Sequence, residues 1–342
     1  MLADELIALP TQPDFRKVVP FQRIGYAALA ADVMRAERFV LQRDAVFLTH
    51  TVCNIAPSRI IPGLQICRMP FPRMWVEFVY KDRDDWYAFS KIKPTTYDDA
   101  SHPARLGFYL EQKDDSGRLI NVTVVWRHND DPHFGGRAIV IGGYAMQLNT
   151  HDNIEVSTAT RNYVEWSFAH PSEMDIKFGA NKRYKDPRDE EAALELQERI
   201  NVDFSVYMSP FWEWIRKNHP EEESALKERA LFDLLQEWRF ILGLLMVINS
   251  RNLLAYSPSI VFDKLNKARK AKGAPLLHSY REIRLGLSLV QRNRLGGVHI
   301  NDIMAHLVRG HFKVRRTGLF WWSPHVRGKG EPTTGRPYVL KV

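Results

Sequence analysis

The sequence predicts an α+β fold with an N-terminal, mostly antiparallel β-sheet region, a central helical region and a C-terminal basic β-hairpin. Three observations predict this fold. Short β-branched and aromatic runs alternate with turn residues between residues 45 and 168. Apolar residues then recur at helical spacing, and period-two alternation returns near residue 283. We therefore expect a β-rich domain with one N-terminal helix over residues 1–170, and a helical region ending in a basic β segment over residues 171–342.

The N-terminal region begins with an Ala-rich helix over residues 21–43. Seven runs after it have the composition of strands: 45–53, 64–69, 74–80, 86–92, 106–112, 119–126 and 138–148. The polar stretches 81–85 and 113–117 are typical of hairpin loops. Glu77 falls on one of these strands, where we expect it at the surface. No alternating βαβ units are expected.

Three helices are predicted in the central region. Asp186-Pro187 has N-cap and N1 chemistry, and the helix that it begins should run to about Tyr207. A second helix begins at Pro220, and its continuation over 226–249 has the wide apolar face of a largely buried helix. Ser257-Pro258 begins a third helix, which ends at Gly273 as a C′ residue. A half-buried strand over 283–289 and a β-like segment over 306–342 complete the chain.

The composition limits the functional classes. The 342 residues are 45% hydrophobic and 26% charged, which excludes wholesale disorder, collagen-like sequence and coiled coil. No well-characterised catalytic signature matches. Gly135-Gly136 and Gly142-Gly143 lack the following helix and acidic residue of a dinucleotide fingerprint, so no cofactor is expected.

The cysteines and apolar runs indicate a cytoplasmic protein. Cys53 and Cys67 are too few to staple a chain of this size, so we expect two packed free thiols, with a single bridge as the alternative. The acidic N-terminus does not resemble a signal peptide. The longest apolar run, 240–248, is far shorter than the roughly 20 residues that span a bilayer, so no membrane partner is expected.

The charge is concentrated at one end of the chain. Residues 264–342 hold 17 Lys and Arg against Glu282, Asp302 and Glu331, although the whole chain carries only +8. This asymmetry favours an anionic partner. The alternative is a solvated basic face.

The third predicted helix is the first part of this basic region. It carries Lys264, Lys267, Arg269, Lys270 and Lys272 within nine residues. So many cations repel one another unless an anion lies nearby, which indicates phosphate contact. The alternative is again a solvated outer face.

The second part is a predicted hairpin that turns at Thr317-Gly318. In this register Arg315 opposes Phe320 and Lys313 opposes Trp322. One face then collects apolar side chains, and the other collects Arg309, His311, Lys313, Arg315, Phe320 and Trp322. Cations neutralise phosphates and aromatic rings stack on bases, so this face suits nucleic acid. The alternative is that Phe320 and Trp322 only cover apolar surface.

Histidines also gather here, at positions 299, 306, 311 and 325. Their spacing does not fit a metal site, and no cysteine accompanies them, so no metal is expected. A phosphoester-processing enzyme would pair His311 or His325 with Arg309 and Arg327 as phosphate clamps.

Parts of this region resemble uncharacterised proteins encoded by bacteriophages and prophages. The similar stretches are Leu265-Asn-Lys-Ala-Arg-Lys-Ala-Lys-Gly-Ala-Pro-Leu-Leu-His-Ser-Tyr280, His306-Leu-Val-Arg-Gly-His-Phe312 and Trp321-Trp-Ser-Pro-His-Val-Arg-Gly328. A fainter match is Arg68-Met-Pro-Phe-Pro-Arg-Met-Trp-Val-Glu77. The resemblance implies a phage origin, and hence the cytoplasm of a bacterial host or the virion. It supplies no activity.

These observations predict a non-catalytic nucleic-acid-binding protein whose partner is DNA or RNA. The predicted contact residues are Lys267, Arg269, Lys270, Arg309, His311, Lys313, Arg315, Phe320, Trp322, His325 and Arg327. A virion structural or assembly component is the second hypothesis, with other phage proteins as partners. A phosphoester-processing enzyme is the third.

Overall fold

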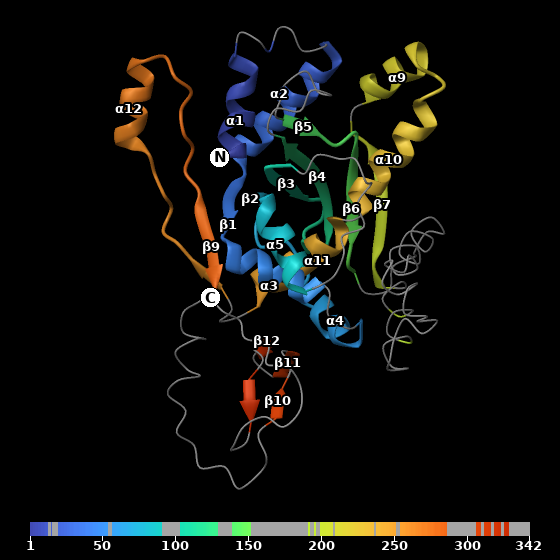
Figure 1. The fold of residues 1–342 in the computed structure, drawn as a ribbon, viewed down its shortest axis with the longest axis vertical. Helices are drawn as coiled ribbons and strands as arrows, with labels where there is room; N and C mark the ends of the chain where they lie inside the picture. Colours follow the sequence, from blue (N-terminus) through green and yellow to red (C-terminus); the bar gives the residue numbers. More distant parts are fainter. Residues whose placement is uncertain are drawn as a thin grey trace.

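A computed structural model describes most of the chain (Figure 1). The described residues are 1–12, 15, 20–53, 57–90, 103–128, 139–151, 191, 195, 199–207, 209–235, 237–250, 254–285, 306–308, 311–315, 318–322 and 325–327. Within them the chain forms a mixed α+β structure, as the sequence predicts.

One mixed sheet of nine strands forms the centre of the described structure. Its strands are β1 (Glu37–Leu41), β2 (Arg73–Val79), β3 (Arg105–Gln112), β4 (Leu119–Arg127), β5 (Ile139–Ile141), β6 (Tyr144–Asn149), β7 (Asn201–Val206), β8 (Leu254–Tyr256) and β9 (Arg281–Leu285). They lie in the order β7-β6-β4-β3-β2-β1-β9-β8, and β5 also pairs with β4. Strand β1 is parallel to β2 and β9, whereas the other pairs are antiparallel.

Helices cover both faces of the sheet. They are α1 (Leu2–Ala8), the 3-10 turn η1 (Leu9–Thr11), α2 (Pro20–Arg35), α3 (Arg43–Cys53), α4 (Pro57–Leu64), α5 (Tyr80–Ser90), α9 (Ser209–Asn218), α10 (Glu223–Leu235), α11 (Glu237–Asn249) and α12 (Asp263–Ala271). Helices α1 and α2 pack around Trp75 and Tyr109 on one face. Helices α3, α4 and α11 form the larger core with Phe78 and Phe108 on the other.

Three central strands of the sheet were predicted at the right positions. The runs 74–80, 106–112 and 119–126 are β2, β3 and β4. The predicted loop 113–117 joins β3 to β4, and Gly117 takes a φ of 72° there, which only glycine adopts without strain. The run 138–148 is split into β5 and β6.

Three predicted strands are wrong. The run 45–53 lies in helix α3. In the run 64–69, Leu64 ends α4 and residues 65–69 follow it without strand structure. Residues 86–90 belong to α5 together with the predicted hairpin loop 81–85. In α3, the β-branched content concealed a helical period, because Ala45, Thr49 and Val52 are buried on one helix face. Packing between α11 and the sheet overrides the β propensity of these residues.

The first predicted helix is too long. Helix α2 ends at Arg35, and β1 begins at Glu37 because Phe39 and Leu41 enter the core with strand alternation. The chain then passes through α3 and α4 and returns as the parallel strand β2. This is one βαβ unit, a connection that the sequence pattern does not indicate.

The helical region also differs in detail. Residues 201–206 form β7 instead of the end of a helix, and the predicted start at Asp186-Pro187 lies outside the described residues. The long predicted helix consists of α10 and α11, of which α11 is largely buried, as predicted. The sheet takes strands from both sides of the proposed boundary at residue 170, and residue 170 itself lies outside the described residues.

The described residues of the C-terminal segment form two small antiparallel pairs of strands. Strand β10 (His306–Val308) pairs with β13 (His325–Arg327), and β11 (His311–Arg315) pairs with β12 (Gly318–Trp322). Lys313 lies opposite Phe320 and Arg315 opposite Gly318, so the register differs by two residues from the predicted one. The predicted turn residue Thr317 lies outside the described residues.

Candidate nucleic-acid interface

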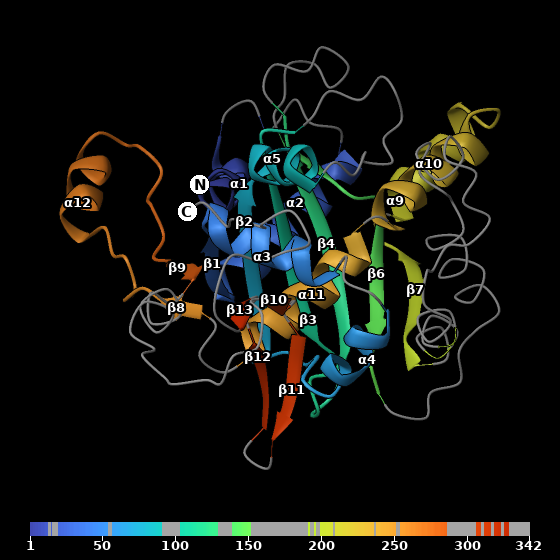
Figure 2. The same cartoon turned by 60° about the horizontal axis from the view of Figure 1, so that its bottom comes forward.

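Residues 254–285 form an arm that leaves one edge of the sheet. The arm consists of β8, α12, β9 and the segments between them, and its two sides are joined by the Ile260–Tyr280 bridge. Figures 1 and 2 both show α12 at the far end of the arm, away from the sheet. No residue of α12 is buried. Every side chain of this helix is therefore at least partly open to solvent.

The root of the arm is fixed to the body by two charged side chains. The Arg38 guanidinium donates to the carbonyl oxygens of Ser279 (2.9 Å), Met34 (2.9 Å) and Val33 (3.1 Å). The buried Asp4 carboxylate accepts the backbone N–H of His278 at 2.7 Å. Burial lowers the pKa of His278, and the Arg38 charge lowers it further. These contacts hold the segment that leads into β9 against α1 and β1.

The tip of the arm is closed by its own hydrogen bonds. The Asn266 amide donates to the Leu277 carbonyl (2.8 Å) and accepts the Leu277 N–H (2.9 Å). The backbone N–H of Gly273 donates to the Lys270 carbonyl, and the N–H of Ala274 donates to the Arg269 carbonyl. This pair of hydrogen bonds is a Schellman motif at the end of the helix. Gly273 has a φ of 64°, as predicted for a C′ residue. The helix begins at Asp263, several residues after the predicted start.

Three lysines form an exposed stripe along α12. Lys264, Lys267 and Lys270 recur every third residue, so they lie on one face of the helix, and all three are exposed. We call these three residues the lysine stripe. Asp263 is the one acidic residue of the helix. The predicted residues Lys267 and Lys270 are thus open to a ligand.

The third predicted residue of this helix is placed differently. The Nε of Arg269 donates to the Pro275 carbonyl at 2.6 Å, and its side chain is half-buried. Arg269 therefore ties the helix to the segment that follows it. Helix α12 and the segments on either side of it add exposed apolar side chains that the sequence did not indicate: Val261 is 62% exposed, Leu265 49% and Leu276 45%.

The predicted C-terminal residues do not join this site. His311, Lys313 and Arg315 lie on β11, Phe320 and Trp322 on β12, and His325 and Arg327 on β13, whereas Arg309 lies outside the described residues. In Figures 1 and 2 these strands lie far from α12. The residues of the predicted interface thus lie in two separate basic segments, α12 and the C-terminal strands.

A buried charge network joins three helices, and the sequence does not indicate it because its members lie far apart along the chain. Arg83 of α5 makes two 2.7 Å bonds to the Glu237 carboxylate of α11, and its Nε donates to His50 Nε2 of α3 at 3.1 Å. Burial lowers the pKa of Arg83, but the charge and hydrogen bonds of Glu237 outweigh it and raise that pKa. Every donor and acceptor named here is satisfied, which indicates a structural role.

Glu77 is a second buried acid, and the expectation of a surface position is wrong. Its side chain is fully buried, and its carboxylate accepts the backbone N–H groups of Leu2 (3.0 Å) and Ala3 (2.8 Å). Trp75 Nε1 and Arg105 Nη2 also donate to it at 2.8 Å. A strand carboxylate thus caps the N-terminus of α1.

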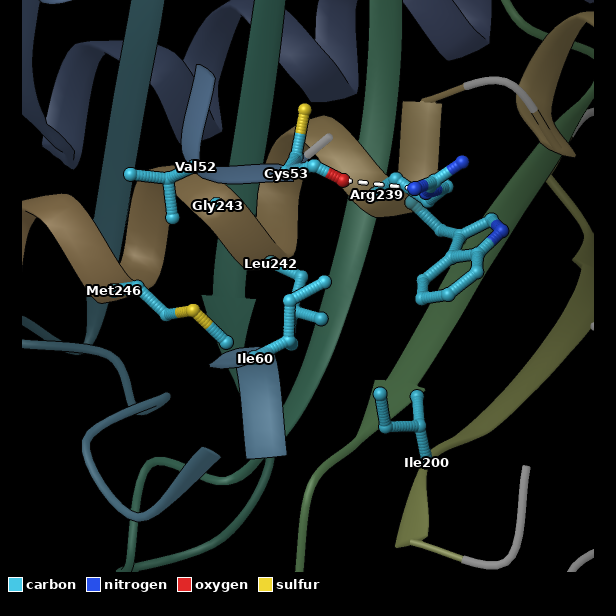
Figure 3. Close-up of a pocket in the computed structure, with 9 residues that line it drawn as sticks. Val52, Cys53, Ile60, Ile200, Arg239, Leu242, Gly243 and Met246 are labelled. Carbon is cyan, nitrogen blue, oxygen red and sulfur yellow. Dashed lines mark hydrogen bonds between the residues drawn. The ribbon is translucent and has the colours of Figure 1, made fainter. Parts of the chain in front are cut away.

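A small cavity lies between α3, α4 and α11 (Figure 3). Its volume is about 10 Å³, and Val52, Leu242 and Met246 give it an apolar wall. Cys53 lies beside it, with its carbonyl bonded to Arg239 at 2.9 Å. Burial raises the pKa of the Cys53 thiol to about 11. The cavity has room for about one water, and the thiol beside it stays protonated, so Cys53 contributes to the packing of the core. Cys53 and Cys67 are both free and buried, as predicted.

Within the described part of the chain, one group of side chains is close enough together to hold a metal ion: His219, Glu221 and Glu222. It lies apart in the sequence from the C-terminal histidines. No described helix is long and apolar enough to cross a membrane.

Comparisons with known proteins identify no relative. No protein-family model, no curated protein and no solved structure matches the chain.

Proposed function

We propose that this protein binds nucleic acid without cleaving it, and that the arm is one of its contact sites. The observation that carries the proposal is the lysine stripe on a helix with no buried residue. The predicted residues of the C-terminal segment are the second proposed site. The bacteriophage origin implied by the resemblance belongs to the same proposal.

The arrangement favours an anionic ligand over a solvated face. The arm holds four lysines and three arginines against Asp263 and Glu282. A nine-residue helix of this charge, held away from the body, gains little from burial and loses free energy through like-charge repulsion. Phosphates would remove the repulsion and release counterions, which is the main source of nucleic-acid affinity.

A charge-matched pair of variants tests the proposal. In Lys267→Gln/Lys270→Gln, we expect weaker binding of a fluorescent DNA or RNA oligonucleotide, measured by anisotropy over a salt series. The control Lys81→Gln/Lys217→Gln removes two exposed lysines from α5 and α9, and it should bind like the unchanged protein. Equal affinity of both variants, or binding that is insensitive to salt, contradicts the proposal.

A virion or assembly component is the second candidate, because Val261, Leu265 and Leu276 expose apolar surface beside the lysines. Such side chains are typical of protein interfaces. Fractionation of purified particles tests this candidate: a fixed stoichiometric copy number in the particle supports it, and absence from the particle rejects it. Turnover of labelled DNA or RNA that is lost in His311→Ala would instead support the enzymatic hypothesis.

A further inference from the structure

Two side chains at the tip that could read bases, Asn266 and Arg269, already make hydrogen bonds within the arm. Asn recognises adenine with one donor and one acceptor on its amide, and both groups of Asn266 are bonded to the Leu277 backbone. Arg recognises guanine with its guanidinium, and the Nε–H of Arg269 is bonded to the Pro275 carbonyl at 2.6 Å, which restricts the directions in which the guanidinium can point. Releasing either side chain would break contacts that shape the arm. Base reading by Asn266 or Arg269 is therefore costly.

The aromatic rings of Phe262, just before α12, and Tyr280, on the returning side of the arm, are also engaged. Phe262 and Tyr280 stack on each other with centroids 6.0 Å apart and an interplanar angle of 30°. Both side chains are half-buried. A platform for unstacked bases needs an open ring face, as in proteins that bind single strands. Phe262 and Tyr280 instead hold the two sides of the arm together.

What the tip presents to a ligand is the lysine stripe. The α-carbons of Lys264 and Lys270 are about 9 Å apart along the helix axis, given a rise of about 1.5 Å per residue. A duplex carries one phosphate charge per roughly 1.7 Å of its axis, so several phosphates lie within reach of these flexible side chains. A single strand has a lower charge density and gains most from base stacking, which the tip does not offer.

We infer that the arm binds the phosphate backbone of a nucleic-acid duplex without reading its base sequence. This inference rests on the proposed function and specifies its ligand class. The arm thus contributes affinity that does not depend on base sequence, and any sequence preference of the whole protein comes from other residues.

The test measures the full-length protein and Lys264→Gln/Lys267→Gln/Lys270→Gln on three duplexes of equal length. One duplex is A·T-rich, one is G·C-rich and one is mixed, and the single strand of the mixed duplex is the fourth probe. We expect the variant to lose affinity by the same factor, within about twofold, on every duplex, and to lose less on the single strand. The slope of log affinity against log salt should fall by about 0.9 for each lysine that contacts a phosphate.

Further outcomes separate the inference from the proposed function. Losses that differ tenfold between duplexes, or a greater loss on the single strand, would overturn the inference alone. Unchanged affinity in the triple variant would also overturn it, because binding would then lie outside the arm. Arg269→Gln should weaken all duplexes alike, and a loss confined to the G·C-rich duplex would indicate base reading. Failure of the unchanged protein to bind any of the four probes would reject the proposed function itself.

Discussion

Arg83 and Glu237 form a bidentate ion pair inside the protein, with both N–O distances at 2.7 Å and both side chains about 5% exposed. The Arg83 guanidinium also lies over the rings of Phe78, Tyr80 and Phe240, at 5.0 to 5.4 Å from their centroids. The pair connects α5 to α11 across the larger core. Breaking such a pair leaves one charge buried without its partner.

Replacing Glu237 by Gln should therefore destabilise the protein strongly. We expect a loss of about 3–5 kcal/mol in the free energy of unfolding, measured by urea denaturation, because the Arg83 charge stays in the core. The exposed acid Glu222 is the matched control, and Glu222→Gln should change the stability by less than about 0.5 kcal/mol. A loss below about 1 kcal/mol for Glu237→Gln would show that the pair adds little.

His50 makes the same network sensitive to acid. Its Nε2 accepts a hydrogen bond from Arg83, so protonation would remove the acceptor and place a second cation beside the guanidinium. Burial first, and then the Arg83 charge, holds the pKa of His50 well below its ordinary value of 6.5. The unfolded chain thus binds this proton at a higher pH than the folded protein does. Stability is full above about pH 6.5 and falls as the pH drops below it, by up to about 1.4 kcal/mol per pH unit from this group.

A non-titrating variant isolates this contribution. His50→Gln keeps an acceptor near Arg83 but cannot bind a proton. Urea unfolding of both proteins at pH 7.5 and 5.5 should show a smaller loss of stability in His50→Gln than in the unchanged protein. Equal losses would assign the acid sensitivity to other groups.

The sequence predicted the elements whose environment is uniform along their length. The residues of β2, β3 and β4 are buried over most of each strand, and those of α11 are buried on nearly all sides of the helix. Their apolar composition alone therefore identified these elements. Gly273 was recognised because a left-handed C′ residue has a local sequence signature.

The errors lie where tertiary contacts decide the outcome. Residues 45–53 have strand composition, but α3 packs on α11, where Gly243 leaves little space beside Cys53. An added Cβ at Gly243 would lie 2.9 Å from that of Cys53. The bonds of Arg269 to Pro275 and of Asn266 to Leu277 depend on how the chain returns after α12. Counting charges could therefore find the lysine stripe, but it could not show that Arg269 is bonded within the arm.

Glu77 is expected to control the docking of α1. Its carboxylate accepts two backbone N–H groups of that helix and pairs with Arg105 at 2.8 Å, in full burial. Glu77→Ala leaves these donors without an acceptor and opens a cavity, so we expect a loss of about 3 kcal/mol or more on urea unfolding. Glu111→Ala, which removes a partly exposed acid from the adjacent strand β3, should cost much less. A comparable cost for both variants would mean that the capping contacts are not decisive.

Arg38 should govern the order of the arm more than the stability of the body. Its three hydrogen bonds join Ser279 to the end of α2, and Arg38→Met removes them while keeping much of the aliphatic volume. Hydrogen exchange of the amides around residues 278–280 should accelerate, because local opening no longer breaks charge-assisted bonds worth about 1.5–3 kcal/mol each. Amides of β3 and β4 should exchange as before. The control Arg284→Met replaces an exposed arginine on β9 and should leave both regions unchanged. Faster exchange throughout the sheet in Arg38→Met would make Arg38 a determinant of global stability, and the fixed orientation of the arm would then need another source.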